Sequence, residues 1–91
     1  MKRIENWVVS KLGGGYVAVP SGKTAEDFSG IIRLNETAKD IFEGLIEGLT
    51  DEQIAARLVE LYEGIDLQKA TAVVASVVEQ LKRKGVPIDE A

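Results

Sequence analysis

The chain has 91 residues, of which 45% are hydrophobic and 29% are charged, so we expect one small soluble domain over residues 1–91. Eleven Lys and Arg residues against fifteen Asp and Glu residues give a formal charge of -4, which disfavours a general affinity for nucleic-acid phosphates. The absence of Cys excludes disulfides and thiolate chemistry, and the absence of His removes the usual proton shuttle near neutral pH. No apolar run is long enough to cross a bilayer, and no signal-peptide pattern follows the N-terminal cations, so we expect a cytoplasmic protein.

Two strands joined by a hairpin are predicted near the N-terminus. Residues 5–12 alternate loosely between two faces, and residues 16–19 form a second run that favours a strand. The three glycines at 13–15 favour a tight turn between them, because Gly accepts the positive φ that such turns demand. A phosphate-binding loop would instead need a helix after the glycines. Residues 20–29 are predicted to form a polar loop.

A third, short strand is predicted over residues 30–34, directly before a helix. Alternate side chains of a strand point to opposite faces, so Ile32 and Leu34 share one face and Arg33 lies on the other. Asn35 is a typical helix N-cap residue, because its side-chain oxygen can accept a hydrogen bond from a free backbone N–H group of the first turn. The strand is therefore expected to feed into the helix without an intervening loop.

Three helices are predicted after the strands. The first spans about residues 36–47, the second begins after Thr50, which forms a capping-box pattern with Gln53, and the third begins after Asp66. Their apolar faces are expected to include Ala38, Ile41, Phe42, Leu45, Ile46, Ile54, Leu58, Leu61, Tyr62, Leu67, Ala70, Val74, Val78 and Leu81. The order βββααα predicts an α+β fold like a winged helix-turn-helix, with a three-stranded antiparallel sheet followed by three helices.

Catalysis is not indicated by this sequence. The serines have no imidazole partner, and the carboxylates fall on polar helix faces without a spacing that would bring two of them together. We therefore expect no catalytic residues, no metal site and no cofactor.

DNA binding by a winged helix is the main alternative. The second and third helices have suitable spacing, but the start of the third helix, residues 66–71, offers only one cation to a major groove. The cations at 82–84 lie at its far end, where attraction to the negative end of the helix dipole explains them without a ligand.

Peptide capture fits the pattern better, although an unrelated interaction module is a further possibility. If the sheet order follows the chain, the strand at 30–34 lies at an edge with unpaired N–H and C=O groups. An extended peptide could add to that edge as a further strand. Val73 and Val77 lie beside the core stripe of the third helix and could form a second wall, or they could belong to the core with the other apolar residues.

The segment Leu34-Asn35-Glu36-Thr37-Ala38 resembles the Leu-Asn-Glu-Thr-Ala box of the PqqD-like domains, the precursor-peptide recognition elements of ribosomal peptide-modification pathways. The resemblance runs over about residues 6–86, with weaker matches at 50–54, 58–62 and 81–85. It implies a compact domain of three strands and three helices. It also implies that the leader segment of a precursor peptide binds as an added strand at 30–34, beside the third helix.

The same resemblance implies partners and a site. The domain would present the leader to a modifying enzyme such as a radical S-adenosylmethionine protein, a cyclase or a leader peptidase. We expect neither nucleic acid nor a membrane as a partner. The domain would act as a monomer or as an edge-paired homodimer. The expected peptide-binding residues are Gly30, Ile31, Ile32, Arg33, Leu34, Lys69, Val73, Val77 and Lys84. Many relatives carry an acidic residue and a Phe where Val73 and Val77 stand, so we expect a leader with aliphatic or aromatic anchors. Acidic leader residues could meet Arg33, Lys69 or Lys84.

Overall fold

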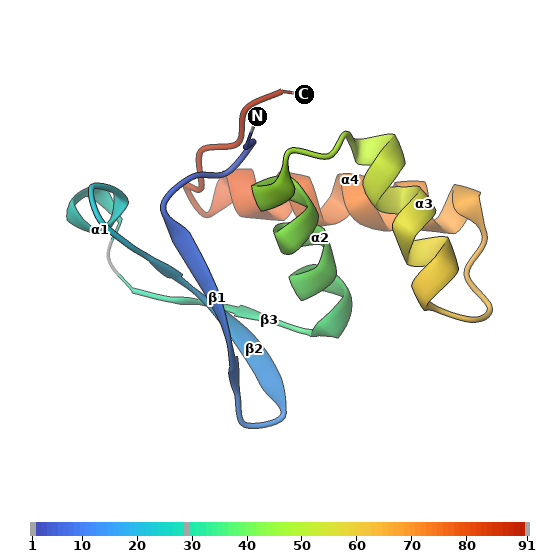
Figure 1. Ribbon diagram of the computed structural model, residues 1–91, viewed down its shortest axis with the longest axis horizontal. Coiled ribbons are helices and arrows are strands. Elements are labelled where there is room, and N and C mark those ends of the chain that lie inside the picture. Colours follow the sequence, from blue (N-terminus) through green and yellow to red (C-terminus); the bar gives the residue numbers. More distant parts are fainter. Residues whose placement is uncertain (1, 29, 91) are drawn as a thin grey trace.

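The computed structural model describes residues 2–28 and 30–90 and has the predicted α+β architecture (Figure 1). Its elements, in chain order, are β1 (Trp7–Leu12), β2 (Gly15–Pro20), α1 (Thr24–Asp27), β3 (Ile32–Leu34), α2 (Glu36–Glu47), α3 (Asp51–Leu61) and α4 (Leu67–Arg83). The predicted order of three strands and then three main helices is confirmed. The one addition is α1, a single helical turn within the segment expected to be loop.

The three strands form one antiparallel sheet in the order β1-β2-β3. The predicted hairpin is confirmed, because β1 and β2 pair from Trp7 opposite Pro20 to Leu12 opposite Gly15. The shorter pairing of β3 with β2 sets Leu34 opposite Tyr16. Because β3 comes last in the sheet, it lies at an edge, as the sequence predicted.

Two strands begin later than predicted. β3 begins at Ile32 rather than Gly30, because Gly30 has φ of 99°, a left-handed conformation that interrupts an extended strand. β1 begins at Trp7, because Asn6 has φ of 65°. The prediction of a strand over all of 30–34 was therefore wrong by two residues.

The three main helices begin where their capping residues predicted. Asn35 accepts a hydrogen bond from the Ala38 backbone N–H at 2.8 Å, and Asp66 caps α4 in the same way. Thr50 and Gln53 form both halves of a capping box. The cap of Asn35 fixes the point at which the chain turns from β3 into α2.

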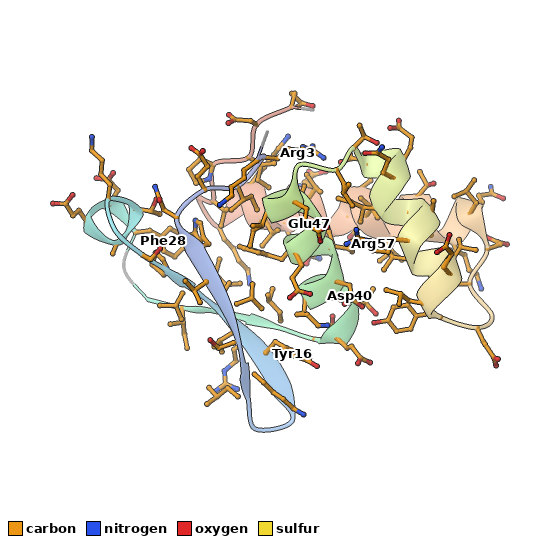
Figure 2. All side chains as sticks on the ribbon, viewed as in Figure 1. Arg3, Tyr16, Phe28, Asp40, Glu47 and Arg57 are labelled. Carbon is orange, nitrogen blue, oxygen red and sulfur yellow. The ribbon has the colours of Figure 1, made fainter. Side chains whose placement is uncertain are left out.

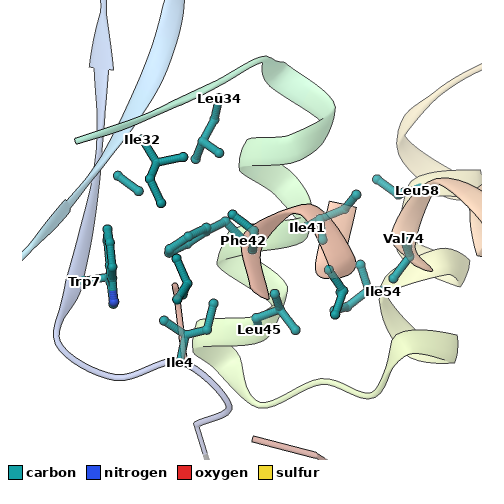
Figure 3. Close-up of a cluster of buried hydrophobic side chains, with 14 of the residues drawn as sticks. Ile4, Trp7, Ile32, Leu34, Ile41, Phe42, Leu45, Ile54, Leu58 and Val74 are labelled. Atoms are coloured by element: carbon teal, nitrogen blue, oxygen red, sulfur yellow. The ribbon is translucent and has the colours of Figure 1, made fainter. Parts of the chain in front are cut away.

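The core lies between the sheet and the helices (Figure 3). Trp7 contacts the rings of Phe28 and Phe42 edge-on, with centroids 4.9 and 5.8 Å apart. The predicted core positions Ile41 and Val74 are fully buried. The predictions for Leu61 and Leu67 were wrong, since these side chains are 57% and 56% exposed, at the last residue of α3 and the first residue of α4.

A buried arginine joins distant parts of the chain. The Arg3 guanidinium donates hydrogen bonds to the backbone carbonyls of Leu49 and Asp89 and to the carboxylate of Asp51, at 2.8–2.9 Å (Figure 2). The backbone N–H of Asp89 also donates to the Arg3 carbonyl at 2.9 Å. The segments near the two chain ends therefore lie side by side (Figure 1).

Within the part of the chain that the structure describes, every helix is too short or too polar to cross a bilayer.

Candidate functional site

The free edge of β3 is the first element of the candidate site. Ile32 and Leu34 are buried at 4% and 6% exposure, so their side chains fix the strand to the core. Ile31 and Arg33 are exposed on the opposite face of the sheet. A ligand at this edge would therefore contact the backbone of β3 together with the side chains of Ile31 and Arg33, while exposed Gly30 lies just before the strand.

A polar cluster joins β2, beside the last residue of β3, to the helices. Tyr16, which lies opposite Leu34 in the sheet, has the ammonium group of Lys39 4.8 Å from its ring centroid. Lys39 pairs with the Asp40 carboxylate at 2.7 Å, and the Tyr62 hydroxyl donates a hydrogen bond to the same carboxylate. The cluster therefore connects β2, α2 and the end of α3 (Figure 2).

The contacts of this cluster raise the pKa values of Lys39 and Tyr62. The hydrogen bond to Asp40 raises the pKa of Lys39 above its usual 10.5. Burial, followed by the hydrogen bond to Asp40, raises the pKa of Tyr62 to about 12. Sequence reasoning missed the cluster, because its residues come from three separate elements and none of them forms a motif.

The end of α4 reaches the segment that leads into β3. A Cβ atom placed on Gly85 would lie 3.6 Å from the ring of Phe28. Lys84 is exposed at this end, and Lys69 is exposed near the start of the helix, about 22 Å away at 1.5 Å per residue. An extended peptide would need about seven residues to contact both lysines.

Val73 and Val77 are half-buried and pack against the core cluster. They are thus neither fully buried core residues nor a free flank, the two alternatives that the sequence left open. Because each keeps part of its surface exposed, α4 presents a shallow apolar strip one helical turn long.

A hollow of about 470 Å³ lies between the hairpin turn and the end of β3. Its lining residues are Leu12, Gly13, Gly14, Gly15, Tyr16, Val17, Arg33 and Leu34. The glycines contribute no side chains, which leaves space beside Arg33. Another hollow, of about 520 Å³, is lined by Asp51 and by residues of α4, and it includes the Arg83–Glu79 ion pair rather than any residue of β3.

The family model of coenzyme PQQ synthesis protein D (PqqD) matches residues 14–86, from the hairpin turn to just beyond α4. The chain belongs to the PqqD family. The resemblance inferred from Leu34–Ala38 is thereby confirmed, and the PqqD match covers β3 and all of the main helices.

Two solved structures share the PqqD-family fold of this chain. One is described as lasso peptide synthetase B1 complexed with the leader peptide, with a TM-score of 0.70, 24% identity and 93% of each chain covered. The other is described as TbiB1 in complex with the TbiA(beta) leader peptide, with a TM-score of 0.72 and 18% identity over 100% of this chain and 99% of that one. No curated protein matches the sequence at a significant level.

The cations at the end of α4 do not form a nucleic-acid-binding face in this PqqD-family domain. Arg83 pairs with Glu79 at 2.9 Å, and Lys82 pairs with Glu90 at 3.5 Å. These carboxylates neutralise two of the three cations at 82–84, so the DNA-binding alternative is not supported.

Proposed function

We propose that this PqqD-family domain, residues 1–91, is a non-catalytic cytoplasmic adaptor. It binds the leader segment of a ribosomally made precursor peptide as a strand along β3, beside α4. It then presents the peptide to a modifying enzyme such as a radical S-adenosylmethionine protein, a cyclase or a leader peptidase. The observation that carries this proposal is the place of β3 at a sheet edge, with its inward side chains buried and its outward backbone free for pairing.

The comparisons support the identity of the guest. Both structures that share the fold are described as complexes with leader peptides. The proposed contacts are the backbone of residues 30–34, the side chains of Ile31 and Arg33, the Val73–Val77 strip, and Lys69 and Lys84 at the two ends of α4. Domain and guest would form a complex with one copy of each chain, unless a second copy pairs with the same edge.

The length of β3 limits how much of the binding energy can come from main-chain hydrogen bonds, and side-chain contacts must supply the rest. A strand of three residues can exchange only two to four main-chain hydrogen bonds with a guest, because alternate residues face outward. At about 1 kcal/mol each, these bonds supply roughly 2–4 kcal/mol, whereas micromolar binding requires about 8 kcal/mol. Side-chain contacts with the Val73–Val77 strip and with Ile31 must therefore supply at least half of the affinity.

A matched pair of substitutions on α4 tests this function. Random peptides of about twelve residues, longer than β3, are displayed and selected on the folded domain, and calorimetry then measures the affinity of selected peptides. Val77→Asp is expected to abolish binding, because a carboxylate on the strip would be desolvated against an apolar anchor. Leu67→Asp makes the same change at an apolar residue of the same helix that is 56% exposed and lies outside the proposed contacts, so it should leave affinity within about twofold.

Two outcomes would contradict the proposal. Equal affinities of the Val77→Asp variant and the unmodified domain would remove α4 from the site, and the failure of any peptide to be enriched would remove peptide capture altogether. A salt titration distinguishes the remaining alternative, because a DNA reader weakens steeply as salt rises, whereas a peptide complex at an edge strand should weaken little.

A further inference from the structure

The outward face of the sheet is apolar except at Ser10 and Arg33. Side chains directly opposite each other in an antiparallel sheet share a face, and Arg33 lies opposite Val17, which lies opposite Ser10. The remaining residues of this outward face are Val8, Leu12, Gly15, Val19 and, just before β3, Ile31. Among these described positions, Arg33 is the one charged side chain.

Arg33 also differs from the other arginines of the chain. Arg3, Arg57 and Arg83 each lie 2.7–2.9 Å from a carboxylate oxygen. Over residues 2–28 and 30–90, no carboxylate lies within ion-pairing distance of Arg33, although acidic residues outnumber basic ones by fifteen to eleven. Arg33 instead lines the open hollow at the hairpin turn.

The geometry of strand pairing places specific guest residues beside this arginine. A strand added along β3 sets one residue opposite Arg33, with Cβ atoms roughly 4.5–5.5 Å apart and both side chains on the outward face. The guest residue two positions away then lies opposite Ile31, again on the outward face. The residue between them lies opposite Ile32 and faces the other side of the sheet.

We propose that β3 selects guest peptides by a pattern of period two: an acidic residue opposite Arg33 and an apolar residue two positions away, opposite Ile31. This inference rests on the proposed function and specifies which sequences that site accepts. A carboxylate is the matching group, because guanidinium pairs with it through two parallel hydrogen bonds. The apolar residue would cover Ile31, which is 51% exposed in the free domain.

A charge reversal with a matched control tests the pattern. Libraries of displayed random peptides are selected in parallel on the unmodified domain, on Arg33→Glu and on Lys23→Glu, which makes the same change at an exposed lysine in the segment before α1. The unmodified domain and Lys23→Glu should enrich peptides with an acidic residue two positions from an apolar one. Arg33→Glu should enrich Lys or Arg at the acidic position.

Calorimetry on one enriched peptide gives the magnitude. Arg33→Glu should weaken its binding about tenfold, because one exposed ion pair is lost and a like-charge pair replaces it. Exchanging the acidic residue of the peptide for Lys should restore most of the affinity for Arg33→Glu and weaken binding to the unmodified domain. Circular dichroism of both variants checks that they are folded.

The outcomes of these selections test the period-two pattern separately from the proposed peptide binding. If the unmodified domain and Arg33→Glu enrich the same residues at every position, the pattern is wrong while peptide capture stands. If the unmodified domain enriches no peptide, the proposed function is wrong and the pattern falls with it.

Discussion

Arg3 and Arg33 are both arginines, but Arg3 is buried and Arg33 is exposed. Arg3 is 5% exposed and donates its hydrogen bonds to the carbonyls of Leu49 and Asp89 and the carboxylate of Asp51. Arg33 is exposed on a short edge strand, with no ion pair to any residue that the structure describes. The difference separates a charge that the fold requires from one that is available to a partner.

The largest expected effect on stability is at Arg3, the buried arginine of this pair. Arg3→Ala should lower the free energy of unfolding by about 3 kcal/mol, because two backbone carbonyls and a carboxylate lose their donor. Urea denaturation measures the change. Lys2→Ala, at the exposed neighbouring residue, should change stability by less than about 0.5 kcal/mol. Equal losses in the two variants would show that Arg3 is not a structural anchor.

The next effect concerns the polar cluster of Tyr16, Lys39, Asp40 and Tyr62, which joins β2 to α2 and the end of α3. The pKa of Tyr62 is raised in the folded protein, so its contribution to stability is complete below pH 10 and is lost as pH rises towards 12. This loss should amount to about 2 kcal/mol, measured by urea denaturation across that pH range. Tyr62→Phe is the control and should lack this part of the pH dependence. A titration in which Tyr62 ionises near pH 10 would contradict the prediction.

A smaller effect is expected where β2 meets the end of β3. A Cβ atom at Gly15 would lie 3.3 Å from the Leu34 carbonyl oxygen, so Gly15→Ala must displace the strand slightly. We expect a loss of about 1 kcal/mol in thermal denaturation and weaker peptide binding. Gly14→Ala adds the same methyl group where no other atom lies within 4 Å, and it should change stability by less than about 0.5 kcal/mol. Identical behaviour of the two variants would show that the strand end is not tightly placed.

The smallest expected effect on stability is at Arg33, the exposed arginine of this pair. Arg33→Ala should change the free energy of unfolding by less than about 0.5 kcal/mol, because Arg33 is exposed and makes no ion pair within residues 2–28 and 30–90. Urea denaturation beside Arg3→Ala provides the direct comparison. A loss approaching that of Arg3→Ala would mean that Arg33 serves the fold rather than a partner.

Helix starts and strand order were predictable because their causes are local. Asn35, Thr50 and Asp66 each cap a helix through atoms no more than three residues away. The hairpin follows from its glycines, and the position of β3 at an edge follows from consecutive strand pairing. The single turn α1 was missed, because Lys23 before it makes no side-chain cap and no apolar period marks it.

The rest of the structure depends on contacts between distant residues. Apolar periodicity assigned Leu61 and Leu67 to the core, but it cannot show where a helix end extends past its neighbours. Arg3 meets partners 46, 48 and 86 residues away, a distance over which no sequence pattern operates. At the site, alternation placed Arg33 on the outward face, but its lack of an internal carboxylate required the complete arrangement of charges.

The Arg3–Asp89 contact has a practical consequence for assembling this domain with a larger protein. Figure 1 shows the two chain ends together on the side away from the hairpin tip and β3. A linker, an affinity tag or a sensor surface placed beyond Arg3 or beyond Asp89 would therefore start from the same side of the domain. Fusion of the domain ahead of an enzyme or behind it should therefore leave the edge of β3 uncovered in both cases.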